Sequence, residues 1–153
     1  MSVSISESAI KDVKFGKGVK IVQPVNLYSC EIGDDSFIGP FVEIQSDVKI
    51  GDRTKVQSHS FICSLVTIGD DCFIGHGVMF INDKFSIGSP AQGDNTLYQK
   101  TIIANNVYIG SNATILPVSI CENVVIGAGA VVTKDITESG FYVGNPALKI
   151  NEK

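Results

Sequence analysis

Residues 32–62 read IGDDSFIGPFVEIQSDVKIGDRTKVQSHSFI, and an aliphatic side chain returns at every sixth position of this stretch. The same phase continues downstream through Ile68 and Ile74 to Phe80 without a slip. A spacing of six fits neither the 3.6-residue period of a helix nor the two-residue alternation of one long strand. Each unit is therefore expected to be a short strand followed by a turn, with its aliphatic side chain in a shared core.

The residues around each aliphatic position support this interpretation. Glycine follows it directly at positions 16, 33, 39, 51, 69, 75, 110 and 127, and Asp, Asn or Ser often fills the next two positions. These residue types tolerate positive φ and close tight turns. A small or β-branched residue, such as Val42, Thr54 or Ser60, stands four positions after each aliphatic one and suits a second inward position. The phase extends upstream to Phe15 and resumes at Ile103, so the repeat covers nearly the whole chain.

Length and composition favour one domain over residues 1–153. The net charge of -4 and the scattered Lys and Arg residues argue against binding to nucleic acid or to an anionic membrane. The N-terminus lacks the pattern of a signal peptide, so a cytoplasmic protein is expected. The four cysteines have no CxxC spacing and are interpreted as reduced thiols.

Units such as IGDDSF (32–37), IGDDCF (68–73) and IGAGAV (126–131) resemble the hexapeptide repeat of left-handed parallel β-helix proteins. In that family three units form one triangular coil, which implies 18 residues per coil and about six coils here. The resemblance therefore predicts an all-β, left-handed parallel β-helix. The open ends of the stack need caps, and the N-terminal segment and the tail after Val132 are the candidates.

The repeat is interrupted between Phe80 and Ile103, where Gly88, Pro90 and Gly93 occur and no six-residue phase exists. A long insertion in a compact repeat is more often functional than accidental. We expect a loop at about residues 83–102 that projects from one corner of the prism.

Residues one coil apart should stack at strand spacing, roughly 4.8 Å. This arithmetic places Ser64 beside Asn82, and it places Asp83 where the loop begins. It also stacks Ser58 with His76 and His59 with Gly77, so both histidines should lie together at the preceding corner.

The histidines and the Asn82–Asp83 pair are thus predicted on different edges of one chain. Three-fold packing would bring one edge of each subunit against a different edge of its neighbour. From this arithmetic and from the trimers usual in the family, a homotrimer with active sites between subunits is expected.

The C-terminal YVGNPALKI (142–150) matches the Gly-Asn-Pro-Ala ending that lies along the bound coenzyme in many acyl-CoA transferases of the family. More widely, residues 15–150 resemble enzymes that acetylate the 3-amino group of dTDP- or UDP-linked amino sugars, as used in O-antigen and other cell-surface polysaccharide biosynthesis. The resemblance implies acetyl-CoA as co-substrate and no metal. The coenzyme-binding residues that it implies are Gly110, Ser111, Gly127, Ala128, Asn145, Pro146 and Lys149.

In these relatives the Asn-Asp pair faces the sugar amine, which implies that Asn82 and Asp83 contact the substrate. Relatives often have Glu where this chain has Ser64, so the substrate corner lacks a second carboxylate. Asp83 is the expected base, with the departing thiolate and His59 or His76 as rivals.

Other interpretations remain open at this point. Asn82 and Asp83 are also common turn residues, and either histidine is equally consistent with structural hydrogen bonding. An O-acetyltransferase of the same fold would use a histidine base on a sugar hydroxyl. A zinc carbonic anhydrase needs three histidine ligands, whereas the chain has two histidines. A non-enzymatic scaffold protein of this fold is a further alternative, but such a protein would not need the long loop.

Overall fold

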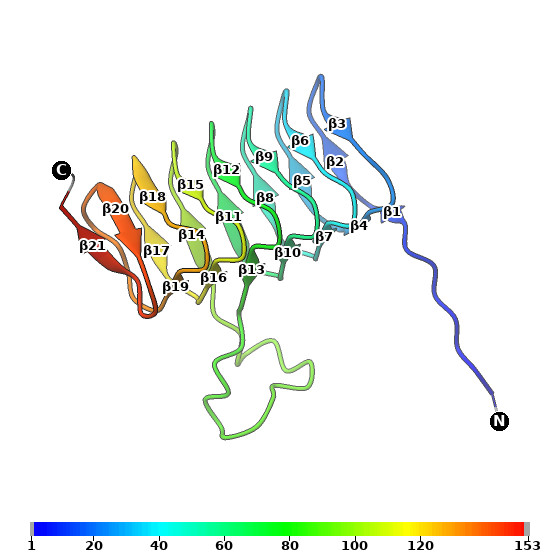
Figure 1. The fold of residues 1–153 in the computed structure, drawn as a ribbon. Coiled ribbons are helices and arrows are strands. Elements are labelled where there is room, and N and C mark those ends of the chain that lie inside the picture. Colours follow the sequence, from blue (N-terminus) through cyan, green and yellow to red (C-terminus); the bar gives the residue numbers. More distant parts are fainter. Residues whose placement is uncertain (1, 152–153) are drawn as a thin grey trace.

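Each six-residue unit folds as a strand of two or three residues followed by a turn, as the spacing predicts. The computed structural model describes residues 2–151 and shows these units stacked as a parallel β-solenoid (Figure 1). The strands form three sheets, so the prism is triangular in section.

The first sheet contains β1 (Ile10–Lys11), β4 (Asn26–Tyr28), β7 (Glu43–Ile44), β10 (Phe61–Ile62), β13 (Met79–Phe80), β16 (Thr114–Ile115) and β19 (Val131–Val132). The second contains β2 (Lys14–Phe15), β5 (Glu31–Ile32), β8 (Lys49–Ile50), β11 (Val66–Ile68), β14 (Thr101–Ile103) and β17 (Ser119–Ile120). The third contains β3 (Lys20–Ile21), β6 (Phe37–Ile38), β9 (Lys55–Val56), β12 (Phe73–Ile74), β15 (Tyr108–Ile109), β18 (Val124–Ile126), β20 (Gly140–Val143) and β21 (Leu148–Ile150).

The chain visits the three sheets in a fixed order and turns three corners in each coil. We call the corner between the first and second sheets the loop corner, because residues 81–100 leave the prism there. The acid corner joins the second sheet to the third and includes residues 33–36, 51–54, 69–72 and 104–107. The histidine corner joins the third sheet to the first and includes residues 39–42, 57–60, 75–78, 110–113 and 127–130.

The aliphatic positions form the core, as the repeat predicts. Ile38, Ile44, Ile62 and Ile74 have no exposed surface, and Phe80 is 1% exposed. Stacking places each of these side chains over its counterpart in the next turn, as in the pairing of Ile62 with Ile44. The core is therefore one continuous column along the solenoid.

Where the residue at the second inward position is polar, its hydroxyl hydrogen-bonds to backbone amides and carbonyls of the corners. The Ser36 hydroxyl donates to the Gly51 carbonyl over 2.8 Å and accepts from the Thr54 amide over 3.1 Å. One turn later, the Thr54 hydroxyl donates to the Gly69 carbonyl over 2.8 Å and accepts from the Cys72 amide over 3.0 Å. These buried hydroxyls thus serve as rungs between turns without leaving an unpaired group.

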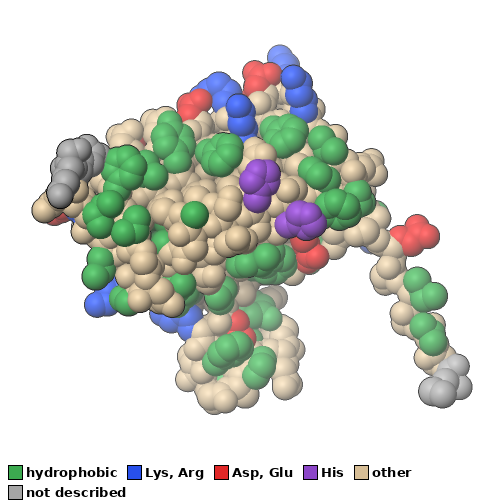
Figure 2. Space-filling model, viewed as in Figure 1, with side chains coloured by type: hydrophobic (Ala, Val, Ile, Leu, Met, Phe, Trp, Pro, Cys, Tyr) green, Lys and Arg blue, Asp and Glu red, His purple; other side chains and the backbone are tan. Residues whose placement is uncertain are grey.

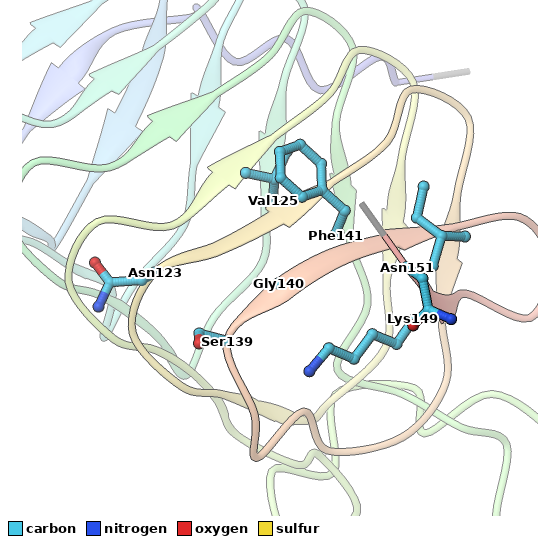
Figure 3. A pocket seen from close by; sticks show the side chains of 8 residues that line it. Asn123, Val125, Ser139, Gly140, Phe141, Lys149 and Asn151 are labelled. Carbon is cyan, nitrogen blue, oxygen red and sulfur yellow. The ribbon is translucent and has the colours of Figure 1, made fainter. Parts of the chain in front are cut away.

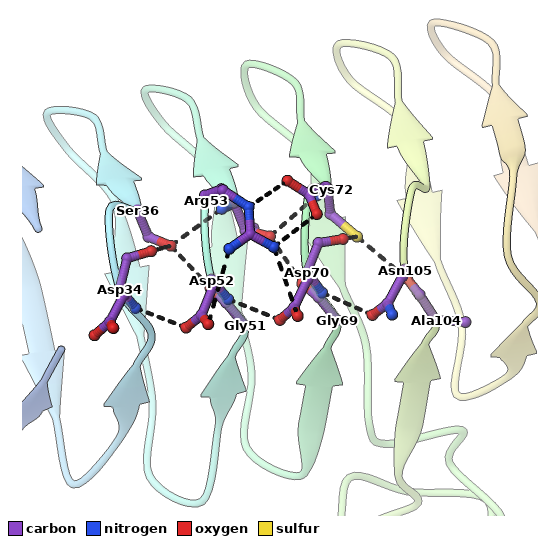
Figure 4. A network of polar contacts seen from close by, with 12 residues as sticks. Asp34, Ser36, Gly51, Asp52, Arg53, Gly69, Asp70, Cys72, Ala104 and Asn105 are labelled. Atoms are coloured by element: carbon purple, nitrogen blue, oxygen red, sulfur yellow. Dashed lines mark hydrogen bonds and ion pairs between the residues drawn. The ribbon is translucent and has the colours of Figure 1, made fainter. Parts of the chain in front are cut away.

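A second set of side chains runs along the outside of the acid corner (Figure 4). The amides of Asp34, Asp52 and Asp70 each donate to a carboxylate or carboxamide oxygen one turn later, over 2.7–2.8 Å. The acceptors are Asp52, Asp70 and Asn105 respectively. Arg53 lies beside these carboxylates, and its hydrogen bonds to Asp71 lower the pKa of that carboxyl.

The structure departs from the sequence predictions in three details. The three sheets amount to about seven turns, more than the six predicted, because strands β1 to β3 already form a turn. The loop ends earlier than predicted, since Thr101 and Ile102 belong to β14 and pair with β11. Residues 2–7 extend away from the coils and do not cap them (Figure 1), and Ala9 joins the first turn by accepting from the Leu27 amide.

The tail after Val132 does cap the other end of the stack. Strand β20 adds to β18 in parallel, and β21 turns back to pair with β20 in the antiparallel direction. Within residues 2–151 the chain forms no helix of the length and hydropathy that a membrane crossing needs. The left-handed winding stays a prediction from the resemblance.

Truncating one member of the core column should destabilise the whole stack. Ile74 is fully buried, so Ile74→Ala should lower the free energy of unfolding by about 2–5 kcal/mol, through lost transfer energy and a residual cavity. Ile102→Thr is the matched control, because Ile102 is 45% exposed and should change stability by about 0.5 kcal/mol or less. Urea unfolding of both variants measures the difference, and equal losses would contradict a column-like core.

Candidate functional site

The histidine corner brings half of the predicted site residues together. Ser58, His76, Ser111 and Ala128 occupy the same position in successive turns, because Ile74 pairs with Ile109 and Ile109 pairs with Ile126. Figure 2 shows the two histidines close together on one face of the molecule. The predicted catalytic histidines and the predicted coenzyme residues therefore share one corner.

The two histidines are held in different ways. His76 Nδ1 lies 2.9 Å from the Ser58 hydroxyl, as the 18-residue spacing predicts. If Nδ1 carries the proton and donates to Ser58, Nε2 is left as an acceptor. The His59 ring instead stacks on Phe41, with 4.8 Å between the ring centroids and an interplanar angle of 18°.

The backbone amides at this corner differ from those at the acid corner. There, the amides of Asp34, Asp52 and Asp70 each donate to an Asp or Asn side chain one turn later. At the histidine corner, the residue one turn after Ser111 is Ala128, and the residue one turn after Ala128 is Gly144. Neither has a side-chain oxygen that could accept from an amide in the same way. Within residues 2–151, the amides of Ser111 and Ala128 are consequently available to an external acceptor.

The neighbouring glycines do not offer free donors. The Gly110 amide donates to the Ile126 carbonyl and the Gly127 amide donates to the Tyr142 carbonyl, each over 2.8 Å. Their role is steric, since a Cβ on Gly110 would lie 2.5 Å from the Ala128 nitrogen. The two glycines permit the close stacking that presents the Ser111 and Ala128 amides.

The Gly144–Ala147 turn joins β20 to β21 and lies beside β19. The Val131 amide donates to the Gly144 carbonyl over 2.9 Å, and the Ala147 amide donates to the Val131 carbonyl over 2.8 Å. Asn145 and Pro146 are exposed at the tip of this turn and are joined by a cis peptide bond. They extend the line of Ser111 and Ala128 by one further turn.

Lys149 lies apart from that line. Its side chain crosses Gly140 and its amine contacts the Glu138 carboxylate over 3.2 Å. Figure 3 shows the side chain running along β20 toward Ser139, in a surface cavity of about 480 Å³ that Asn123 and Phe141 also line. The Lys149–Glu138 pair is exposed, so little free energy opposes exchanging Glu138 for another anion.

The loop corner holds the remaining predicted residues. The Asn82 carboxamide nitrogen donates to the Ser64 hydroxyl over 2.8 Å and to the Ser64 carbonyl over 3.2 Å, as the coil arithmetic predicts. These two bonds fix the orientation of the carboxamide. Its oxygen is then the atom that remains to accept from a ligand.

Asp83 has a structural task that the sequence analysis did not identify. One carboxylate oxygen accepts from the Phe85 amide and the other accepts from the Ala91 amide, each over 2.8 Å. The second bond closes the start of the loop, and Ala91 is 6% exposed although its neighbours are exposed. The only signal in the sequence was the position of Asp83 at the start of an aperiodic segment.

The Asn82–Asp83 pair and the histidines lie on different corners, because strand β13 separates them. One chain therefore does not assemble all the predicted residues at one point. No group of three or more His, Cys, Asp and Glu side chains within residues 2–151 is arranged to hold a metal ion. Burial raises the pKa of the Cys30 and Cys63 thiols to about 11 and about 12, so neither is a ready nucleophile.

Comparison with known proteins gives matches to two family models. Residues 29–64 match the model described as bacterial transferase hexapeptide (six repeats). Residues 65–81 and 100–134 match the model described as hexapeptide repeat of succinyl-transferase. Together these segments make up more than half of the chain, and the unmatched gap contains the projecting loop.

A curated relative and two solved structures extend this result. The chain is 32% identical over 157 aligned residues to the bifunctional protein GlmU of Clostridium botulinum, with 99% of this chain but only 31% of the relative covered. AntD, an N-acyltransferase from Bacillus cereus, superposes in its complex with dTDP and coenzyme A at a TM-score of 0.79, with 25% identity and 92% and 84% of the two chains covered. A Vibrio cholerae hexapeptide-repeat acetyltransferase in complex with acetyl coenzyme A gives a TM-score of 0.68 at 25% identity, with 78% and 69% covered.

The contacts of Asp83 predict a local effect on the loop that is independent of any chemistry. Asp83→Ala removes the acceptor of both amides, so hydrogen exchange at Phe85 and Ala91 should accelerate about tenfold. Asp94→Ala is the control, because Asp94 accepts from the nearby Thr96 amide in the same loop. Exchange followed by NMR should separate the two variants, and unchanged protection at Ala91 in Asp83→Ala would contradict the assigned contact.

Proposed function

This chain belongs to the hexapeptide-repeat acyltransferases, and we propose that it transfers the acetyl group of acetyl-CoA to the 3-amino group of a nucleotide-linked amino-dideoxy sugar. The nucleotide we favour is dTDP, and the product serves cell-surface polysaccharide biosynthesis. The chain spans about a third of the length of the curated relative. The proposal rests on one observation: the backbone amides of Ser111 and Ala128 have no side-chain acceptor, and they lie in the same row of turns as residues 144–147.

These amides match the needs of an acyl-CoA. A pantetheine arm is a chain of amides whose carbonyl oxygens require donors, and the thioester oxygen becomes negative as the acceptor attacks. The Ser111 amide, next to His76, is the proposed donor to the thioester oxygen, and the Ala128 amide is the proposed donor to the arm. Asn145 and Pro146 would flank the arm, while Lys149 would exchange Glu138 for a phosphate of the coenzyme.

The acceptor side is proposed at the loop corner. The Asn82 carboxamide oxygen, oriented by Ser64, accepts a hydrogen bond from the sugar amine. Asp83 has further lone pairs beyond the two that bind the loop amides, and these orient the amine and take its proton. Because a sugar amine titrates nearer to about 8 than to the 10.4 of lysine, a modest base suffices.

The reaction needs few groups beyond positioning. The amine nitrogen attacks the thioester carbonyl, the new C–N bond forms, and the C–S bond breaks as the coenzyme A thiolate leaves. The amine proton passes to Asp83 and then to the thiolate, or directly to the thiolate. Holding the two reactants in contact supplies much of the rate.

A homotrimer is part of the proposal, because the donor groups and the acceptor groups lie on different corners of one chain. Three-fold packing that sets the histidine corner of one subunit against the loop corner of the next would unite them. Size-exclusion chromatography with multi-angle light scattering should then give three times the 16.3 kDa chain mass. A monodisperse monomer would contradict the shared site.

A sugar O-acetyltransferase is the second candidate, and one contact favours it. If His76 Nδ1 donates to the Ser58 hydroxyl, Nε2 is available as a base, which a hydroxyl acceptor of high pKa requires. In that reaction His76 would remove the hydroxyl proton during attack on the thioester.

Turnover with a panel of acceptors distinguishes the two candidates. Acetyl-CoA consumption, followed by thiol release, should occur with a dTDP-linked 3-amino sugar, and Asp83→Asn should lower the rate about 10²–10⁴-fold by removing the base. His59→Ala and His76→Ala should reduce this rate much less than Asp83→Asn. Turnover of hydroxyl sugars alone, with severe loss in His76→Ala, would reject the amine acceptor and support the second candidate.

A further inference from the structure

The stacked pair of Phe41 and His59 is unusual among the corners of this solenoid. Both residues adopt positive φ, 61° and 63° respectively, where most of the other non-glycine residues are Asp or Asn. Positive φ recurs at this turn position in the corners of the solenoid, and a bulky aromatic residue is uncommon there. Phe41 is also 57% exposed, although its ring is stacked on His59.

The position of the pair along the histidine corner indicates what it meets. The available amides of Ser111 and Ala128 lie on the C-terminal side of His76, so the coenzyme approaches from there. Phe41 and His59 lie on the N-terminal side, in the two turns before Gly77. With the coenzyme proposed on the C-terminal side, the N-terminal side is left for the second substrate, which would run past His59 toward Phe41.

A shallow cavity adjoins the outer side of Phe41. It has a volume of about 230 Å³, and its walls include Pro24, Val42, Asn26 and Glu43. Exposed Pro24 and Phe41 provide apolar surface, while the carboxamide of Asn26 and the carboxylate of Glu43 provide hydrogen-bonding groups. This combination suits a flat heterocycle, which has an apolar face and a polar edge.

We propose that Phe41, backed by His59, is the stacking platform for the pyrimidine base of the nucleotide-linked substrate. The inference deepens the proposed function and rests on it, because it requires a nucleoside diphosphate sugar as acceptor. His59 is then a positioning residue that supports the Phe41 ring, and His76 is the histidine nearer to the reacting atoms. Base stacking on one aromatic ring typically strengthens binding by a factor of about ten or more.

Calorimetric titration with dTDP and with inorganic pyrophosphate tests the platform directly. In Phe41→Leu the side chain keeps its apolar character but loses the ring, so dTDP should bind about tenfold more weakly while pyrophosphate binding stays unchanged. Phe41→Tyr keeps the ring and should bind dTDP within about twofold of the wild type. Phe15→Leu is the matched control, because Phe15 is 43% exposed on the second sheet and should have no effect.

Three results would overturn the platform. They are a dTDP affinity of Phe41→Leu within twofold of the wild type, an equal loss for dTDP and pyrophosphate, and no binding of dTDP to the wild type. Thermal unfolding and coenzyme A binding of each variant confirm that the fold is intact. Acetyl transfer is measured separately and distinguishes the two proposals. If the enzyme turns over but Phe41→Leu does not weaken dTDP binding, only the platform is rejected. If Phe41→Leu weakens dTDP binding but the wild type shows no turnover, only the transferase reaction is rejected.

Discussion

Parallel hydrogen bonding between successive turns is the constraint on which every other feature depends. The Gly51 amide donates to the Ile68 carbonyl and the Gly33 amide donates to the Ile50 carbonyl, each over 2.8 Å, so the register advances by one turn without drift. This register places like residues over like residues. It forms the aliphatic column inside, the hydroxyl rungs beside it and the carboxylate ladder outside. A side chain at a corner is therefore positioned by the backbone of two neighbouring turns.

The three corners use this common backbone differently. At the acid corner, side-chain oxygens accept from the amides of Asp34, Asp52 and Asp70. At the histidine corner the same backbone geometry carries Ser111 and Ala128 without such acceptors, so the amides stay available. The binding proposed at this corner would thus depend on the absence of a structural side chain, and that absence costs little because water can hydrogen-bond to the exposed amides.

Sequence periodicity predicted both the fold and the contacts that follow from its register. The Ser58–His76 contact was calculable because both residues lie in uninterrupted repeat. The Ser64–Asn82 contact was calculable because Asn82 follows Phe80 by only two residues, where the chain still keeps the register. The bond from Ala91 to Asp83 was not, since loop residues have no counterpart one turn away. The partner of Lys149 also escaped prediction, because the antiparallel β20–β21 hairpin departs from the repeat. Where the phase ends, spacing no longer determines contacts.

All the irregularities of the repeat fall on the loop corner. The steps from Leu27 to Ile32 and from Ile115 to Ile120 each lack one residue there, and residues 81–100 are inserted there. The stack tolerates these changes because β14 re-enters in register, with Ile103 beside Ile68 and Ile120. A corner at which length can vary without loss of core packing is a corner at which substrate contacts can change. The acceptor groups are assigned to that corner, whereas the coenzyme groups are assigned to the regular histidine corner. A division of this kind would let acceptor specificity diverge while coenzyme binding stays fixed by the repeat.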